Sequence, residues 1–482
     1  MRLPLLIICI LLPLAGFAQT GYHLKFKIEG LNDTTLYLGN FYGETTYIKD
    51  TARSNSRGEF EFKGSKPLLY RGEYFIVLRQ NGKPTTQFYF LIADNQHFSM
   101  ETKSSDYVKN MKVTGDLDNT LFFENMVFNS GLNKQAEPFI KILQDSTQSA
   151  EKKKEARIGY NAVNEKALAH QKEVITKHPN TLTAKILKAH QPVTVPDPPK
   201  RADGSIDSTF QLKWYRKHFF DNFDLTEQGL ICLQTPLYKN KINEYLDKLF
   251  IQHPDTLMNA MALYIDRAKP NQETFKYTTW ITLLKYQQPE IMGLDEIYVR
   301  MYDKYYGSGL MDFWVNDKLK KNLKEHADRM RHSLVGMKAP NLIMQDANFK
   351  AKNMYDIKNK YTVLYIFDPD CGHCKEETPK LVKFYNSRKY DVQVYAVSAD
   401  TSMQKMRDYI KEMKMPWITV NGPRTYVGPY GDLYDAIVTP SLYIIDENKK
   451  IIAKKVPVDK LNEFFTQYER FKIQDKTKTG KL

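Results

Sequence analysis

The sequence is poor in cysteine, with only four among its 482 residues. They are Cys9, Cys232, Cys371 and Cys374. So few cysteines exclude a small disulfide-rich fold that depends on several disulfide bonds. They also leave no second cysteine pair to complete a zinc site with Cys371 and Cys374, and no histidine pair has ligand spacing. We therefore expect no metal centre.

Long apolar runs are scarce as well, and the only one lies at the start of the chain. Leu3–Leu14 follows a short positive segment and precedes small residues that end at Ala18, which is the pattern of a signal peptide. The run is short for a membrane span. The bulky Ile7-Ile8 pair before Cys9 argues against processing as a lipoprotein. We predict that residues 1–18 are a cleaved signal peptide and that the mature protein is exported to the periplasm.

The chain lacks the motifs of nucleic-acid-binding and nucleotide-binding proteins, although its formal net charge is +14. No zinc-finger, RNP-like or P-loop pattern is present. Basic residues are dispersed and mixed with acidic ones, as in Glu151-Lys-Lys-Lys-Glu155. We therefore expect a solvated basic surface and no nucleic-acid partner. Peripheral attraction to an anionic membrane stays open.

Residues 20–115 have the pattern of an all-β domain. Leu24, Phe26 and Ile28 alternate with charged residues, which predicts a strand with one buried face. Further strands are expected at Thr35–Leu38, Glu59–Phe62, Tyr74–Leu78 and Gln87–Ile92. Short strands separated by turn residues predict a small sandwich or barrel.

Residues 116–332 lose this alternation and show helical periodicity, for example over residues 150–178 and 210–223. They predict an all-α domain. Cys232 lies there in the apolar stretch Leu230-Ile-Cys-Leu, which indicates a buried, inert thiol.

Residues 333–474 alternate between strand and helix patterns, and 475–482 form a tail. The β-branched and aromatic run Tyr361–Phe367 predicts a buried strand, and a turn follows it. Cys371-Gly-His-Cys374 then opens a segment with Leu381, Phe384 and Tyr385 at helical spacing. A Cys-x-x-Cys between strand and helix is typical of the redox dithiol of thioredoxin-like proteins.

The position of Cys371 has a physical reason. Free backbone N–H groups and the dipole at a helix start stabilise a thiolate, which is the attacking species. Cys374 is close enough to form a redox-active disulfide with Cys371, so no external cofactor is expected. A purely structural disulfide is the alternative, but such a tight loop constrains the unfolded chain little.

Four features together resemble the TlpA/ResA-type thiol-disulfide oxidoreductases of the thioredoxin superfamily. They are the Gly336-Met-Lys-Ala-Pro340 segment, the Cys371-Gly-His-Cys374 motif, Glu377, and the segment Val438-Thr439-Pro440-Ser441. The resemblance covers about residues 335–472. The β-domain also resembles those that precede TlpA-like domains in some exported bacterial proteins. One departure concerns Tyr365, which replaces the buried Asp of thioredoxin.

The resemblance implies roles for individual residues. Cys371 would attack a substrate disulfide and Cys374 would resolve the mixed disulfide. Glu377 would relay protons for Cys374, and His373 would tune the Cys371 thiolate by its charge. Thr439 and the cis-proline Pro440 would present backbone groups to a bound peptide.

These patterns predict a multidomain protein with an N-terminal all-β sandwich or barrel, a central all-α domain and a C-terminal α/β thioredoxin-like fold. Its function would be disulfide exchange with protein substrates in the cell envelope, coupled to a membrane electron donor or acceptor. The direction of electron flow stays open.

Two other functions compete with this one. A non-enzymatic envelope binding or assembly protein with a redox-sensing domain is the first. A peroxiredoxin is the second, because it shares the Ala339-Pro340 start. Asp368 argues against the peroxiredoxin, since peroxidatic sites carry Thr or Ser three residues before the reactive cysteine.

Overall fold

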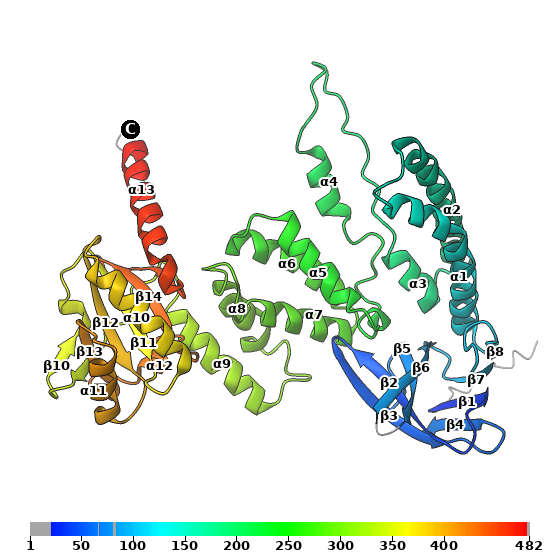
Figure 1. Ribbon diagram of the computed structural model, residues 1–482, viewed down its shortest axis with the longest axis horizontal. Helices are drawn as coiled ribbons and strands as arrows, with labels where there is room; N and C mark the ends of the chain where they lie inside the picture. The colour runs from blue at the N-terminus through cyan, green and yellow to red at the C-terminus, as the bar shows by residue number, and fades with distance from the viewer. Residues whose placement is uncertain (1–20, 66, 81–82, 480–482) are drawn as a thin grey trace, which may run out of the picture. The chain divides into compact units, whose positions relative to one another are not determined.

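The computed structural model describes residues 21–65, 67–80 and 83–479. The predicted signal peptide, with Cys9, lies outside these residues. The described chain has an N-terminal β-sheet domain, a central helical region and a C-terminal α/β domain, which confirms the predicted fold class (Figure 1).

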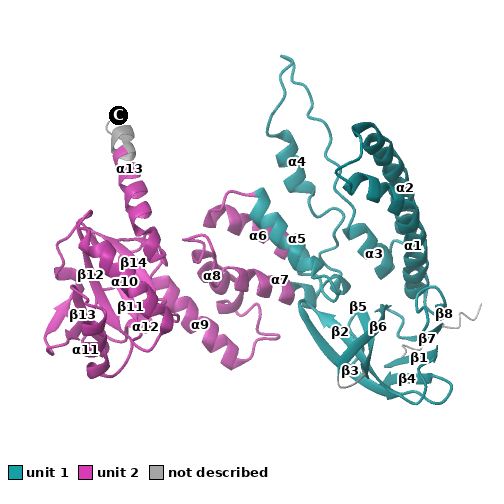
Figure 2. Cartoon of the chain, in the orientation of Figure 1, with its two compact units in different colours: residues 1–249, 266–275 teal, residues 250–265, 276–482 magenta. Residues whose placement is uncertain are grey.

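The described chain divides into two compact units (Figure 2). The first comprises the described residues up to Leu249 together with Asp266–Phe275. The second comprises Phe250–Ile265 and the described residues from Lys276 onward. Each unit therefore contains part of the helical region, and the domain boundaries expected at 115 and 332 stay predictions.

The β-domain of the first unit consists of two four-stranded sheets, with strand orders β4-β1-β7-β8 and β3-β2-β5-β6. Both sheets contribute apolar side chains to one core, which makes the domain a sandwich. Leu24, Phe26 and Ile28 lie in this core, as their alternation predicts. The strands are β1 (Tyr22–Glu29), β2 (Thr35–Tyr42), β3 (Thr45–Arg53), β4 (Glu59–Gly64), β5 (Gly72–Gln80), β6 (Lys83–Ile92), β7 (His97–Lys103) and β8 (Lys112–Thr114).

The sequence patterns miss β3, β7 and β8. β3 is an edge strand with no buried residue, so it has no alternation of apolar and polar residues to detect. Exposed Tyr47 and Ile48 stand next to each other in it, on opposite faces. A one-sided burial pattern is the signal on which strand prediction depends, and β3 does not have one.

The helices of the first unit begin with a pair of long neighbours, α1 and α2, which lie side by side (Figure 1). Asp116 and Ser149 cap their N-termini by accepting hydrogen bonds from backbone N–H groups. Cys232 is buried as predicted. The helices are α1 (Leu117–Gln144), α2 (Ala150–Lys177), α3 (Leu182–Ala189), α4 (Phe210–His218), the short η1 (Gln228–Leu230) and α5 (Leu237–Leu249).

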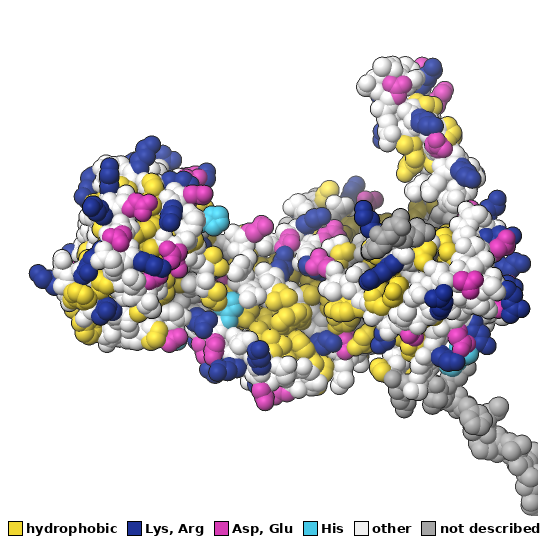
Figure 3. Space-filling view, turned by 60° about the horizontal axis from the view of Figure 1, so that its bottom comes forward, with side chains coloured by type: hydrophobic (Ala, Val, Ile, Leu, Met, Phe, Trp, Pro, Cys, Tyr) yellow, Lys and Arg dark blue, Asp and Glu magenta, His cyan; other side chains and the backbone are white. Residues whose placement is uncertain are grey.

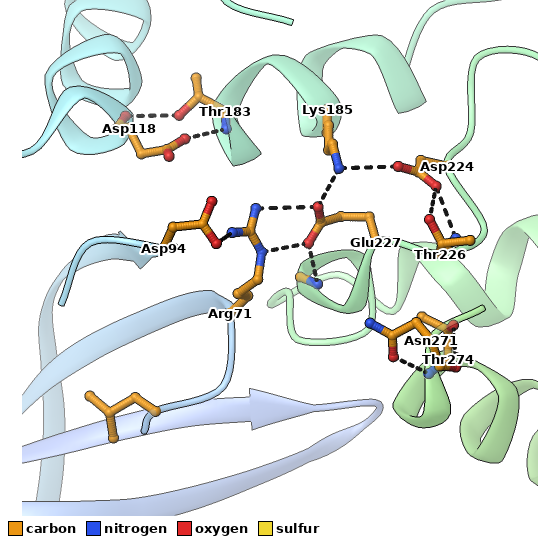
Figure 4. A network of polar contacts seen from close by, with 12 residues as sticks. Arg71, Asp94, Asp118, Thr183, Lys185, Asp224, Thr226, Glu227, Asn271 and Thr274 are labelled. Carbon is orange, nitrogen blue, oxygen red and sulfur yellow. Dashed lines mark hydrogen bonds and ion pairs between the residues drawn. The ribbon is translucent and has the colours of Figure 1, made fainter. Parts of the chain in front are cut away.

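A network of charged side chains connects the β-domain to the helices of the first unit (Figure 4). The buried carboxylate of Glu227 accepts hydrogen bonds from Arg71 at 2.9 Å and from Lys185 at 2.7 Å. Burial alone would raise the pKa of Glu227, but these two cations hold it below its ordinary value. The network therefore keeps a buried charge paired, as a structural contact requires.

The second unit begins with helices and ends with the α/β domain. The boundary between the units passes through α6 and α7. The helices are α6 (Pro254–Ala268), α7 (Gln272–Lys285), α8 (Glu296–Met301), the π-helical η2 (Tyr302–Gly307) and α9 (Asp317–His332). None of the described helices has a long enough apolar stretch to cross a membrane.

The α/β domain contains a seven-stranded mixed sheet with the order β10-β9-β13-β12-β11-β14-β15. β11 lies inside it, parallel to β12 and antiparallel to β14. All seven β11 residues are buried, because apolar clusters cover both faces of the sheet. Its strands are β9 (Ile343–Asp346), β10 (Ala351–Asn353), β11 (Tyr361–Phe367), β12 (Val392–Ser398), β13 (Ile418–Thr425), β14 (Ser441–Asp446) and β15 (Ile451–Lys454).

Helices pack against both faces of this sheet. Leu381, Phe384 and Tyr385 of α10 are buried, as their helical spacing predicts. α13 extends to Thr479, into the segment expected to be a tail. The helical segments are η3 (Met354–Asp356), α10 (Gly372–Asn386), α11 (Met403–Glu412), α12 (Tyr430–Leu433), η4 (Val458–Lys460) and α13 (Leu461–Thr479).

Basic and acidic side chains are interspersed on the face of the molecule in Figure 3. The described helices carry surface ion pairs one helical turn apart, such as Lys141 with Glu137 and Lys324 with Asp328. Such pairs reduce the local effect of the positive net charge.

Candidate active site

Cys371 lies at the junction of β11 and α10. The turn after β11 is held by Asp368, whose backbone oxygen accepts a hydrogen bond from the Cys371 N–H at 3.1 Å. Cys371 is the N-cap residue of α10, so it faces the unsatisfied N–H groups of the first helical turn. Its side chain is half-buried. The strand, turn and helix therefore place this thiol where a substrate can reach it.

The surroundings of Cys371 favour its thiolate. Desolvation pushes the pKa of this thiol upward, but hydrogen bonds from the backbone N–H and the thiol of Cys374 oppose that effect. The backbone N–H of His373 acts in the same direction. The pKa of Cys371 is therefore below its ordinary value, as expected for a nucleophilic cysteine at a helix start.

Cys374 lies one turn inside α10 and is fully buried. Burial is the largest cause that raises the pKa of its thiol to about 12, and the nearby Cys371 adds to the rise. The backbone N–H of Asp368 points at the Cys374 sulfur from 3.5 Å. The two cysteines are not joined by a disulfide in this structure. One thiol is therefore accessible and acidic, and the other is hidden and protonated.

The Thr439–Pro440 segment lies against the reactive cysteine. The peptide bond between Thr439 and Pro440 is cis, and the carbonyl oxygen of Thr439 is 3.4 Å from Sγ of Cys371. Ile437 and Val438 just before it are about 60% exposed (58% and 60%). Exposed apolar side chains next to a nucleophile provide a surface for a substrate polypeptide.

Glu377 lies one helical turn after Cys374, and its side chain is about three-quarters buried, with 25% exposed. It lines a cavity of about 360 Å³ together with Tyr365 and Pro440. Its carboxylate also forms an ion pair with Lys380 at 2.5 Å. The structure thus places Glu377 beside the dithiol region, and its role in proton relay stays a prediction.

The imidazole of His373 lies at the surface. Its side chain is 84% exposed, and its Nδ1 lies 3.8 Å from a carboxylate oxygen of Glu376. Its backbone N–H, by contrast, is among the groups that lower the pKa of Cys371. Tuning by the imidazole charge stays a prediction, whereas the backbone contribution follows from the helix start itself.

A buried set of three hydroxyl groups below Cys374 was not predicted from the sequence. Thr378 donates a hydrogen bond to the Cys374 carbonyl at 2.7 Å. Its oxygen also lies 2.9 Å from the hydroxyls of Tyr365 and Tyr409. Because Thr378 has a single hydroxyl proton, both tyrosines must donate to it. Tyr365, which stands where thioredoxin carries a buried Asp, thus fixes the first turn of α10.

Three carboxylates near the turn lie close enough together to consider a cation. They are Asp368, Asp370 and Asp400. Lys405 already pairs with Asp370 at 2.5 Å and with Asp400 at 3.1 Å. The lysine ammonium therefore supplies the positive charge that this cluster needs.

Three family models match the chain. Residues 335–454 match the AhpC/TSA family. Residues 22–122 and 167–329 match two families described as domains of unknown function, DUF4369 and DUF5106. The chain is also similar to the thiol-disulfide oxidoreductase ResA of Bacillus cereus, with 26% identity over 125 residues, which are 25% of this chain and 68% of that protein.

Two solved structures are similar to parts of the chain. One is a domain of a "possible thiol-disulfide isomerase" from Cytophaga hutchinsonii, with 36% identity, covering 29% of this chain and 97% of that one, at a TM-score of 0.28. The other is a thioredoxin-like protein from Bacteroides caccae, with 19% identity, covering 57% of this chain and 98% of that one, at a TM-score of 0.46.

The family match over residues 335–454, the similarity to ResA and the dithiol at the start of α10 agree with one another. The C-terminal domain of this chain belongs to the TlpA/ResA-like thiol-disulfide oxidoreductases of the thioredoxin superfamily.

Proposed function

We propose that the protein is exported and exchanges disulfides with proteins of the cell envelope through Cys371 and Cys374. The redox-active disulfide between these two residues would be its only redox group. One observation carries the proposal. The structure splits the pair into an accessible thiol of lowered pKa and a buried thiol whose pKa is raised to about 12.

The first step in the reducing direction is attack of the Cys371 thiolate on a substrate disulfide. A bond forms between the Cys371 sulfur and one substrate sulfur, and the substrate S–S bond breaks. The second substrate sulfur leaves as a thiolate and takes a proton. The lowered pKa of Cys371 supports this assignment, because it increases the fraction of reactive thiolate at neutral pH.

The second step releases the substrate. Cys374 loses its proton and attacks the Cys371 sulfur, so the mixed disulfide breaks and the Cys371–Cys374 disulfide forms. The substrate leaves with both sulfurs reduced, and the enzyme has lost two electrons. The same steps in reverse oxidise a substrate dithiol.

The second step needs a proton acceptor, because the pKa of Cys374 is about 12. Glu377 is the carboxylate that we assign to this role, since it follows Cys374 by one helical turn and lines the cavity at Pro440. Its carboxylate also forms an ion pair with Lys380 at 2.5 Å. A membrane donor or acceptor would reset the dithiol after each turnover, and Thr439 and Pro440 would contact the bound polypeptide.

The proposal is tested by trapping partners with Cys374→Ser in the full chain. Without the resolving thiol, the mixed disulfide of Cys371 with a substrate persists. We expect envelope proteins to be captured in complexes that disappear on reduction. Cys371→Ser is the matched control, because it keeps the fold and the second thiol but lacks the nucleophile.

Equal capture by the two variants would contradict the assignment of Cys371. Failure of the reduced full chain to reduce insulin disulfides would favour the non-enzymatic alternative. Recovery of the captured partners in the cytoplasmic rather than the envelope fraction would contradict export.

A further inference from the structure

The cavity beside the dithiol is not built by the thioredoxin-like domain alone. It is bounded on one side by Pro440, Tyr365 and Glu377, and on another by Gln288 and Pro289. The last two lie in the loop between α7 and α8, outside the segment 335–454 that matches the AhpC/TSA family. The helical region thus contributes a wall to the cavity next to the reactive cysteine.

This wall is held against the domain by buried contacts within the second unit. Asp295 and Lys454 form an ion pair in which both side chains are only 3% exposed. The sulfur of Met292 accepts a hydrogen bond from the Lys454 backbone N–H at 3.3 Å. Both contacts lie within a few residues of Gln288 and Pro289. A buried, paired contact of this kind fixes the position of a loop.

A second polar contact holds the same parts of the chain. Buried Asp435 pairs with Lys455 at 3.0 Å and lies 3.7 Å from His326 of α9. His326 and Lys455 also hold the pKa of Asp435 well below its ordinary value, although burial opposes them. Both sets of contacts therefore join the helical region to the α/β domain near the cavity.

The lining of the cavity is mainly apolar. Its polar side chains include Glu377 and Lys455, and each already has a partner of opposite charge, Lys380 and Asp435. A charged ligand would gain little from groups that are already neutralised. An apolar ligand, in contrast, would cover Pro289, Val438 and the neighbouring proline and valine side chains.

We propose that Gln288 and Pro289 complete a specificity pocket for a bulky apolar side chain of the substrate, next to its reactive cysteine. This inference rests on the proposed function and adds a role for the helical region. Pro440 lines the pocket, and the preceding Thr439 carbonyl lies 3.4 Å from the Cys371 sulfur. Because a residue spans about 3.3–3.6 Å along an extended chain, we assign the pocket to a residue next to the bonded cysteine.

The size of the cavity fits this occupant. At about 360 Å³ it is at the small end of ligand pockets, which are roughly 300–1,000 Å³. It can hold one large side chain but not a folded element. The match between substrate and pocket would then appear in the rate of the first exchange step, because the pocket is filled when the mixed disulfide forms.

The test uses the reduced full chain and disulfide-linked dimers of the peptide Gly-X-Cys-X-Gly, with X as Phe, Leu, Ala, Lys or Glu. Hydroxyethyl disulfide, which has no side chain for the pocket, measures basic exchange. We expect the second-order rate constant to be about tenfold higher for Phe or Leu than for Ala, as for other apolar pockets.

Gln288→Trp fills the pocket from the helical side. Gln288 is exposed, so the substitution does not disturb the core. We expect the preference for Phe over Ala to fall below about threefold. Glu290→Trp is the matched control, because Glu290 is exposed in the same loop but does not line the cavity. It should keep the full preference.

Pro289→Gly is the second variant, and it should reduce the preference by removing an apolar wall rather than by filling the cavity. An unchanged preference in Gln288→Trp, or a preference of the unmodified chain for Lys or Glu peptides, would overturn the inference. If hydroxyethyl disulfide and all peptides fail to react with the unmodified chain, the result contradicts the proposed function and, with it, this inference.

Discussion

The network around Glu227 and the dithiol of Cys371 and Cys374 both hold titratable groups in buried surroundings, but their pKa values shift in different ways. In the network the opposite charges support each other, so the pKa of Glu227 is lowered and the pKa values of Arg71 and Lys185 are raised. In the dithiol the pKa values of two chemically identical groups diverge. The pKa of the Cys371 thiol falls, while the pKa of the Cys374 thiol rises to about 12.

This difference distinguishes buried groups that stabilise the fold from buried groups that take part in chemistry. A network that favours its charged forms stabilises the fold and has no reason to change protonation at neutral pH. In a pair whose pKa values are shifted in opposite directions, one member is deprotonated and can attack while the other stays protonated. Acid–base catalysis and disulfide exchange both require this division.

A substitution in the dithiol should strongly reduce the exchange activity and hardly change the free energy of unfolding. Cys371→Ser removes the nucleophile, so we expect disulfide exchange to fall at least about 1,000-fold, measured with insulin as substrate. The free energy of unfolding should hardly change, because the side chain is half-buried and similar in size. Cys232→Ala serves as the control, since Cys232 is buried in the other unit and should not affect exchange.

A substitution in the network around Glu227 should reduce the stability of the fold and leave the exchange activity unchanged. Glu227→Ala leaves Arg71 and Lys185 without their buried partner, so we expect the first unit to lose about 3 kcal/mol of stability in urea unfolding. Thiol exchange should stay at the level of the unmodified chain. Asp94 pairs with the same Arg71 but is 89% exposed, and Asp94→Ala should therefore change stability little. Equal effects of the two substitutions would break the comparison.

Glu377 should affect only the second exchange step. Glu377→Gln removes the assigned proton acceptor and a negative charge near Cys374, so we expect release of the mixed disulfide to slow about tenfold. The pKa of Cys374 should decrease slightly, because burial and Cys371 are the larger causes of its rise. Rapid-quench measurements separate attack from release. Slower attack with unchanged release would contradict the role of Glu377.

The hydroxyl groups below Cys374 should have the smallest effect. Tyr365→Phe removes one of the two donors to Thr378, and we expect a loss of about 1 kcal/mol in the free energy of unfolding. The attack rate of Cys371 should not change. A large loss of exchange in this variant would mean that the tyrosine participates in the chemistry and does not only position α10.

The site was easier to predict from the sequence than parts of the fold. The dithiol depends on a local pattern in which a fully buried strand, a turn and an amphipathic helix follow one another, and the structure has all three at the expected residues. β13 has no such pattern. Gly422 and Pro423 interrupt its alternation, and its register with β9 shifts between Asn421 and Thr425.

Contacts between distant segments could not be predicted. Tyr409 reaches Thr378 only because α11 packs beside β11 and α10, and Gln288 reaches the cavity only because its loop is fixed by Asp295 and Lys454. The spacing of residues along the chain predicts neither of these two contacts. The exposure of the His373 side chain could not be predicted either, because a helix start leaves several side-chain directions open.

The pH dependence of alkylation distinguishes the acidic thiol of Cys371 from the buried thiol of Cys374. Thiolates are the reactive form, so a lowered pKa moves labelling to lower pH and a raised pKa moves it to higher pH. The reduced, folded full chain is treated with iodoacetamide between about pH 5 and 10, and each cysteine is quantified by peptide mapping. We expect Cys371 to be labelled with a midpoint below the ordinary thiol value, while Cys374, with a pKa of about 12, stays unlabelled throughout. Similar midpoints for both cysteines, or earlier labelling of Cys374, would contradict this expectation.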